Sequence, residues 1–196
     1  MSVKQSNEIT VKIKCDIEEF YKLMQERRAK IIKKFSMVDS YYIPENLDIE
    51  NMSTREILSK AILIRDIHQH MPEKAVKKIT FKIKDFDEKG DIISQQAISC
   101  NILKIEEAKQ LLQAIGYREI MIIRENDVET EIDGLQFAIK DIENGDKLIE
   151  VETGENENFD TIEKLVNKIN GINIPIYTDN YFVKKAEIEL DKVLKR

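Results

Sequence analysis

The chain has 196 residues, of which 35 % are charged and 42 % are hydrophobic, and its formal net charge is −6. This composition predicts one soluble globular domain, residues 1–196, long enough to bury a sizeable core. The acidic balance argues against non-specific nucleic-acid binding, because that binding depends on surplus Lys and Arg. No apolar run approaches the roughly 20 residues of a membrane span. Cys15 and Cys100 show no metal-ligand spacing, and the N-terminus has no apolar signal-peptide core, so we expect a cytoplasmic protein with reduced thiols.

The first half of the chain combines strands with two helices. Residues 8–14 alternate strictly between polar and apolar side chains, which predicts a strand. Asp16-Ile17-Glu18-Glu19 is typical of a helix start, and a helix of about fourteen residues follows. Further strands are expected at 37–43, 62–68, 76–84 and 91–100, with a capped helix from Ser53 to about Lys60 and a turn at 85–90.

The second half repeats this mixture of hairpins and helices. A helix is expected at 104–115, with Gly116 as its stop. Asp133-Gly134 is a strong hairpin signal. The expected strands are 117–124, 129–132, 135–141 and 148–153, followed by helices from about 160 to 169 and from about 179. Because helices alternate with antiparallel hairpins, the pattern favours an α+β fold with a large antiparallel sheet over a doubly wound one.

Five of the expected strands carry charged side chains on one face. In the first strand the apolar residues face one way and Glu8, Thr10 and Lys12 the other, since successive strand side chains point to opposite faces. On one strand this pattern is most simply a solvated surface. Its repetition predicts a polar interior if the faces converge. The charged residues on these faces are Glu8, Lys12, Arg65, Lys82, Arg124, Glu150 and Glu152.

Charged strand faces that converge in this way would favour particular ligands. Neighbouring glutamates raise one another's pKa unless a cation joins them. Mg²⁺ or Mn²⁺ is the natural cation for carboxylate oxygens, while Arg and Lys suit phosphate oxygens. The expected metal ligands are Glu8, Glu150 and Glu152, and the expected phosphate ligands are Lys12, Arg65, Lys82 and Arg124.

From Glu8 to about Tyr181 the sequence resembles the CYTH superfamily, the triphosphate tunnel metalloenzymes. That group includes class IV adenylate cyclases, thiamine triphosphatases and inorganic tripolyphosphatases. The similar segments are 8–12 (E-x-E-x-K in the family), 39–42 (D-T-Y-F), 61–65 (A-L-R-I-R), 79–82 (L-T-Y-K) and 145–152 (G-x-F-V-E-I-E). The resemblance implies an antiparallel eight-stranded β-barrel with flanking helices, open at both ends, with metal and triphosphate inside.

The chain departs from the family pattern mainly in charge. Thr10 replaces the second acid of the first strand, and Gln95 and Gln96 stand in the segment where the family has R-x-E-x-E. Where the family has a late acid, this chain has Lys140 or Asp141, depending on register. These departures imply a tunnel with fewer acids and bases.

The resemblance implies metal-dependent binding and hydrolysis, or cyclisation, of a triphosphate-containing substrate. One alternative is a catalytically depleted tunnel that acts as a nucleotide or polyphosphate sensor, and another is a purely structural role. The expected partner is a triphosphate or nucleotide small molecule, with no nucleic acid and no membrane. A homodimer is compatible with the sequence.

Overall fold

The computed structural model describes residues 8–71, 73–86, 92–153, 156 and 161–195. Within these ranges the chain forms eight strands and five helices. The strands are β1 Glu8–Lys12, β2 Lys30–Pro44, β3 Ile62–Met71, β4 Glu73–Phe86, β5 Ile92–Asn101, β6 Tyr117–Ile132, β7 Leu135–Ile142 and β8 Lys147–Glu152. The helices are α1 Ile17–Glu26, α2 Thr54–Ser59, α3 Ile105–Ala114, α4 Ile162–Ile172 and α5 Lys185–Leu194.

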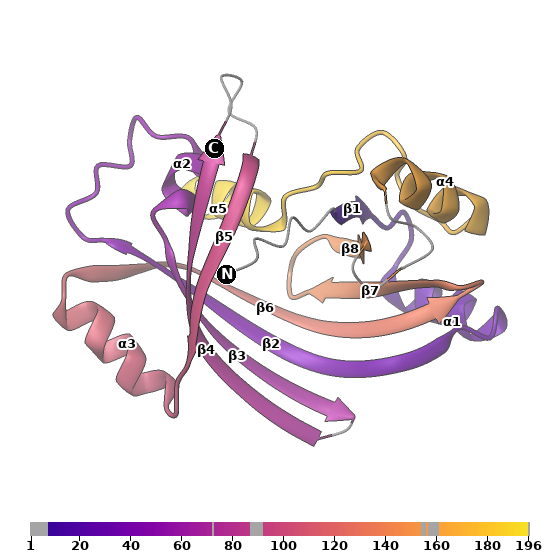
Figure 1. Cartoon of the computed structure of the whole chain (residues 1–196), viewed down its shortest axis with the longest axis horizontal. Coiled ribbons are helices and arrows are strands. Elements are labelled where there is room, and N and C mark those ends of the chain that lie inside the picture. The colour runs from indigo at the N-terminus through magenta and orange to yellow at the C-terminus, as the bar shows by residue number, and fades with distance from the viewer. Residues whose placement is uncertain (1–7, 72, 87–91, 154–155, 157–160, 196) are drawn as a thin grey trace.

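All eight strands belong to one antiparallel sheet with the order β1-β8-β7-β6-β2-β3-β4-β5. Figure 1 shows the long strands β2, β3, β4 and β6 curving, so that the sheet is barrel-like. β1 and β5 are its two edges, and the described residues form no hydrogen-bonded ladder between them. The predicted α+β fold with eight antiparallel strands is confirmed, as a curved sheet that hydrogen bonds do not close.

The outer edge of β1 is covered by the segment that leads into α5. The Thr10 N–H donates to the Tyr181 carbonyl at 2.9 Å, and the Val183 N–H donates to the Thr10 carbonyl at 3.0 Å. The Tyr177 N–H donates to the Lys12 carbonyl at 2.9 Å. β1 is therefore held on one side by β8 and on the other by residues 175–183, which fixes the direction of its side chains.

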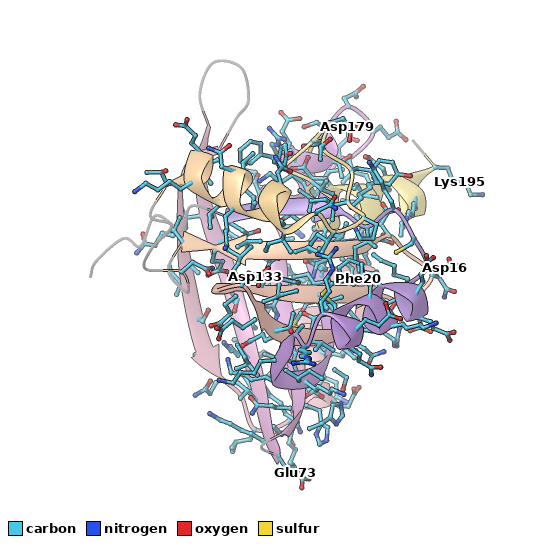
Figure 2. The ribbon with its side chains drawn as sticks, turned by 90° about the vertical axis from the view of Figure 1, so that its right-hand side faces the viewer. Asp16, Phe20, Glu73, Asp133, Asp179 and Lys195 are labelled. Atoms are coloured by element: carbon cyan, nitrogen blue, oxygen red, sulfur yellow. The ribbon has the colours of Figure 1, made fainter. Side chains whose placement is uncertain are left out.

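The outer face of β1, β7 and β8 packs against α1 and α4. Ile9 and Val11 are fully buried there, together with Phe20 of α1 and Leu165 of α4. Figure 2 marks Phe20 where α1 meets the sheet. Burial of each such side chain stabilises the fold by about 1.5–3 kcal/mol. The opposite, inner face of these strands carries Glu8, Glu150 and Lys140, with apolar residues at one end.

The remaining helices pack on other parts of the sheet. α3 covers β2 and β3 through Tyr42 and Leu112. α2 and α5 place Ile57 and Leu190 in a cluster with Leu148, an inward-facing residue of β8. Apolar side chains thus fill one end of the interior, where the family resemblance implies an opening. No helix within the described ranges is long and apolar enough to cross a membrane.

The strand and helix boundaries differ from expectation most in β2, α5 and β6. β2 begins at residue 30 instead of 37, and α5 begins at 185 instead of 179. β6 is continuous from 117 to 132, whereas two shorter strands were expected. The polar stretch around Glu125 and Asp127 suggested a break, but both side chains are buried inside the sheet. The turn expected at 85–90 falls mostly outside the described residues. The capping box of Ser53 and Glu56 is confirmed.

Two glycines provide a matched test of packing in the β7–β8 connection. A Cβ at Gly145 would lie 2.6 Å from Cγ2 of Ile142, while one at Gly171, in α4, would meet nothing within 4 Å. We expect Gly145→Ala to lower the free energy of unfolding by about 1–3 kcal/mol. Gly171→Ala should leave it unchanged or raise it by up to about 1 kcal/mol. Urea denaturation checks both, and equal effects would contradict the packing described here.

Candidate functional site

Three glutamates meet on the inner face of β1 and β8. Antiparallel pairing sets Glu8 opposite Glu152 and Thr10 opposite Glu150, so these side chains share one face. Carboxylate oxygens of Glu8, Glu150 and Glu152 lie within 4.8 Å of one another, and all three residues are half-buried. The structure thus brings together the three residues that the sequence analysis expected as metal ligands.

The three carboxylates of this triad repel one another, so a positive charge among them would be stabilising. Burial raises the pKa of Glu8, and the neighbouring Glu150 and Glu152 raise it further. The Thr10 hydroxyl donates to Oε1 of Glu8 at 3.1 Å and opposes the shift. Three clustered carboxylates are a donor set of hard oxygens, which fits Mg²⁺ or Mn²⁺. A cation bound by the three carboxylates would offset the electrostatic repulsion among them.

Arg65 extends into the same interior from β3. Its Nε and Nη2 donate to the two carboxylate oxygens of Asp39 at 2.7 and 2.6 Å. Asp39 is 1 % exposed. Burial opposes the charge of Arg65, but the contact with Asp39 outweighs it and raises the pKa of Arg65. The guanidinium is therefore permanently charged and held rigidly, while no described residue accepts a hydrogen bond from its Nη1.

Lys82 approaches the triad from β4, near the opposite edge of the curved sheet. Burial lowers its pKa, the nearby Arg65 lowers it further, and Glu8 and Asp39 oppose this. Glu8 lies on β1 and Lys82 on β4, so the curved sheet brings its two margins toward each other. Among the described residues, none forms an ion pair with Lys82. Its half-buried ammonium is available to an anion.

Lys140 is a site residue that the sequence analysis did not assign. It lies on the inner face of β7 and is 6 % exposed. Its Nζ lies 3.0 Å from Oδ2 of Asp127 and 3.3 Å from Oε1 of Glu150. Burial opposes its charge, but Glu150 and Asp127 outweigh it and raise the pKa of Lys140. Burial also raises the pKa of Asp127, to about 7, with Lys140 opposing. The sequence held one indication of this position. Lys140 is spaced at period two from apolar residues of β7, so it shares a strand face with them.

Lys185 is a second interior lysine that the sequence did not indicate. It opens α5, and its Nζ lies 2.7 and 2.8 Å from the two carboxylate oxygens of Glu125. Glu125 is buried on β6. A helix from the end of the chain thus reaches the sheet interior, which strand alternation cannot predict.

Arg124 was expected to face the interior and does not. It is exposed on the outer face of β6, because Glu125 and Asp127 take the inner face of that strand. Lys12 shares the face of Glu8, but its Nζ pairs with Asp146 at 2.7 Å and its side chain is 38 % exposed. It therefore lies at the margin of the site. Gln96 is exposed on the outer face of β5, opposite Ile83 in register.

Comparison with known proteins supports the fold. No protein-family model matches the chain, and no curated protein matches its sequence. The PH1819 protein of Pyrococcus horikoshii has a similar structure, with a TM-score of 0.64 and 19 % identity over 96 % of this chain and 99 % of that one. A proposed adenylate cyclase of Vibrio parahaemolyticus is similar with a TM-score of 0.58 and 11 % identity over 100 % of both chains.

A third similar structure is HpAC1 of Hippeastrum, a proposed adenylyl cyclase described as having a dominant triphosphatase activity. Its TM-score is 0.53, with 13 % identity over 92 % of each chain. At these identities the three likenesses establish a shared fold. The chain thus shares its α+β fold with these three proteins.

The buried ion pairs of Lys140 predict a pH-dependent cost for its removal. Lys140→Met leaves Asp127 without its partner, and we expect the free energy of unfolding to fall by about 3–5 kcal/mol at pH 8. The loss should be smaller at pH 5. Asp127 has a raised pKa in the folded state, so it takes up a proton there and the stability linked to that proton disappears as the pH rises. Urea unfolding at both pH values, with a chelator present, measures this.

Lys192→Met is the control, because Lys192 pairs with Glu189 one helical turn away on the surface of α5. It should change stability by less than about 0.5 kcal/mol at either pH. If Lys140→Met behaves in the same way, the pairs at Lys140 do not support the fold.

Proposed function

We propose that this protein binds a triphosphate-containing compound together with Mg²⁺ or Mn²⁺ inside the curved sheet, and hydrolyses it. The observation that carries the proposal is the carboxylate triad of Glu8, Glu150 and Glu152 facing the same interior as Arg65 and Lys82. Carboxylates beside unsatisfied cationic donors form a combined site for a metal ion and a phosphate chain. The fold shared with a triphosphatase is consistent with this proposal.

The interior charges explain why a metal ion would be required. The site residues described above include six carboxylates, Glu8, Asp39, Glu125, Asp127, Glu150 and Glu152, and four bases, Arg65, Lys82, Lys140 and Lys185. Three of these bases already contact carboxylates. A bare triphosphate would therefore meet an interior with excess negative charge. Binding of the anion would depend on a divalent cation at the triad.

Each side chain has a role that follows from its contacts. Glu8, Glu150 and Glu152 would hold the cation, which when bound supplies positive charge to phosphate oxygens and lowers the pKa of a coordinated water. Lys82 would hold phosphate oxygens as a point charge. Arg65 would hold them through Nη1, since Asp39 fixes the orientation of the guanidinium. Charge that develops during transfer would be stabilised by groups already in place.

One observation favours a second candidate, a polyphosphate or nucleotide sensor that does not turn over. Thr10 faces Glu150 in register and bonds to Glu8, where a further carboxylate would strengthen the metal site. Thr offers only a neutral hydroxyl. Weaker metal occupancy would slow hydrolysis while still permitting binding.

Lys82 and Arg124 provide a matched pair for testing the proposal. Both are strand bases, but Lys82 faces the interior and Arg124 faces outward. With Mn²⁺ present, Lys82→Met should slow phosphate release from tripolyphosphate by about tenfold or more, since a charged hydrogen bond contributes about 1.5–3 kcal/mol. Arg124→Met should stay within about twofold of the wild type.

Phosphate release and thermal shift should be measured on the same samples. Stabilisation by Mn²⁺ with tripolyphosphate but no phosphate release would favour the sensor. No stabilisation and no release in the wild type would reject both candidates.

The metal ligands are tested separately by calorimetry with Mn²⁺. Glu150→Gln and Glu152→Gln each delete an anionic ligand while preserving shape, and should weaken Mn²⁺ binding by about tenfold or more. Without metal, Glu152→Gln should lower stability little, because it also relieves repulsion within the triad. Glu150→Gln should lower it more, because it takes away one of the two carboxylate partners of the buried Lys140. Glu163→Gln, in the first turn of α4, is the control. Wild-type affinity in both triad variants would exclude them as ligands.

A further inference from the structure

Lys140 joins the proposed metal site to a carboxylate outside it. Its ammonium lies between Glu150, a member of the triad, and Asp127, which is not. The contact with Asp127 is the shorter, at 3.0 against 3.3 Å. The side chain of Lys140 is 8 % exposed and that of Asp127 is 0 % exposed, whereas that of Glu150 is 26 % exposed. One end of this bridge is therefore fully buried and the other opens toward the triad.

The carboxylate of Asp127, at the buried end of this bridge, lacks part of its hydrogen bonding. Oδ2 of Asp127 accepts a hydrogen bond from Lys140, but Oδ1 is buried and has no hydrogen-bond partner among the described residues. An unsatisfied buried carboxylate oxygen is costly. An ammonium group has three N–H donors. If Lys140 turned fully to Asp127, it could serve both oxygens, but it would then leave Glu150.

We propose that Lys140 is a built-in counter-ion that competes with the divalent cation for Glu150. With the cation site empty, Lys140 neutralises part of the triad and keeps its carboxylates close together. With the site filled, Glu150 belongs to the cation, and Lys140 moves to Asp127, whose second oxygen gains a donor. Lys140 thus sets the metal affinity as a positioning residue, and Asp127 is the partner that receives it. This inference rests on the proposed metal site.

A different role for Lys140, direct binding of phosphate, fits the contacts less well. Its Nζ already has two carboxylate neighbours, whereas Lys82 has no ion-pair partner among the described residues. Two like charges also repel, so the ammonium beside Glu150 disfavours a cation there. Removing the ammonium should therefore strengthen cation binding, and this effect should depend on Asp127. A role in phosphate binding instead predicts weaker binding of tripolyphosphate and no dependence on Asp127.

The test is calorimetric titration of the full chain with Mn²⁺ alone, at neutral pH, for a double-mutant cycle. Lys140→Met should bind Mn²⁺ at least about tenfold more tightly than the wild type, since a repelling charge is lost. Asp127→Asn should bind it several-fold more weakly, because Lys140 then keeps only Glu150. In the Lys140→Met background, Asp127→Asn should have a much smaller effect. Such non-additivity distinguishes action through Lys140 from a general loss of charge.

Lys185→Met is the matched control, since it removes an interior lysine that pairs with Glu125 outside the triad. It should change Mn²⁺ affinity less than Lys140→Met does. If the wild type binds Mn²⁺ and the Lys140 and Asp127 substitutions act additively or leave affinity unchanged, the inference fails and the proposed function stands. Lys140→Met with unchanged Mn²⁺ affinity but weaker tripolyphosphate binding would assign Lys140 to phosphate.

If neither the wild type nor Lys140→Met binds Mn²⁺, the metal site and the inference fall together. Binding by Lys140→Met alone would support the inference strongly. Should Lys140→Met fail to fold, Asp127→Asn decides, and affinity equal to or tighter than that of the wild type would overturn the proposal.

Discussion

The site depends on the register between β1 and β8. Because Glu8 pairs with Glu152 and Thr10 with Glu150, a two-strand ladder places three carboxylates on one face of the sheet. A shift of one residue would turn every side chain of β1 to the other face and place Ile9 and Val11 in the polar interior. Both are fully buried against α1 and α4, so hydrophobic packing on one face fixes the chemistry on the other. Hydrogen bonds between residues 175–183 and the outer edge of β1 secure the same register.

Charged side chains inside the curved sheet form ion pairs with one another, so the interior is not an empty polar tunnel. Asp39 holds Arg65, Asp127 and Glu150 share Lys140, and Glu125 holds Lys185. Ion pairs of this depth contribute little net stability, since desolvation offsets attraction, but removing one partner is costly. They keep the strand faces polar and position the groups around the triad. The apolar cluster of α2 and α5 fills one end of the interior.

Much of this arrangement could be predicted from alternation along single strands. The carboxylate triad was predicted from β1 and β8, where the residues from Glu8 to Lys12 and from Ile149 to Glu152 alternate between apolar and polar, and Arg65 and Lys82 were also assigned to the interior. Arg124 was misplaced because β6 carries charged residues on both faces, and nothing local shows that the acids are the buried ones. Lys185 was missed because its role depends on how α5 docks, which is a long-range feature. The bridging position of Lys140 depends on the pairing of three strands, β6, β7 and β8.

The central claim is that three carboxylates from two paired strands hold a divalent cation inside the curved sheet. The most direct measurement is the anomalous scattering of Mn²⁺ in crystals of the protein grown with that ion. The account predicts one strong Mn²⁺ peak bonded to oxygens of Glu8, Glu150 and Glu152, with oxygen–metal distances of roughly 2.0–2.6 Å, typical of hard cations. A peak bound elsewhere, with the triad carboxylates in contact only with Lys140 and water, would contradict it.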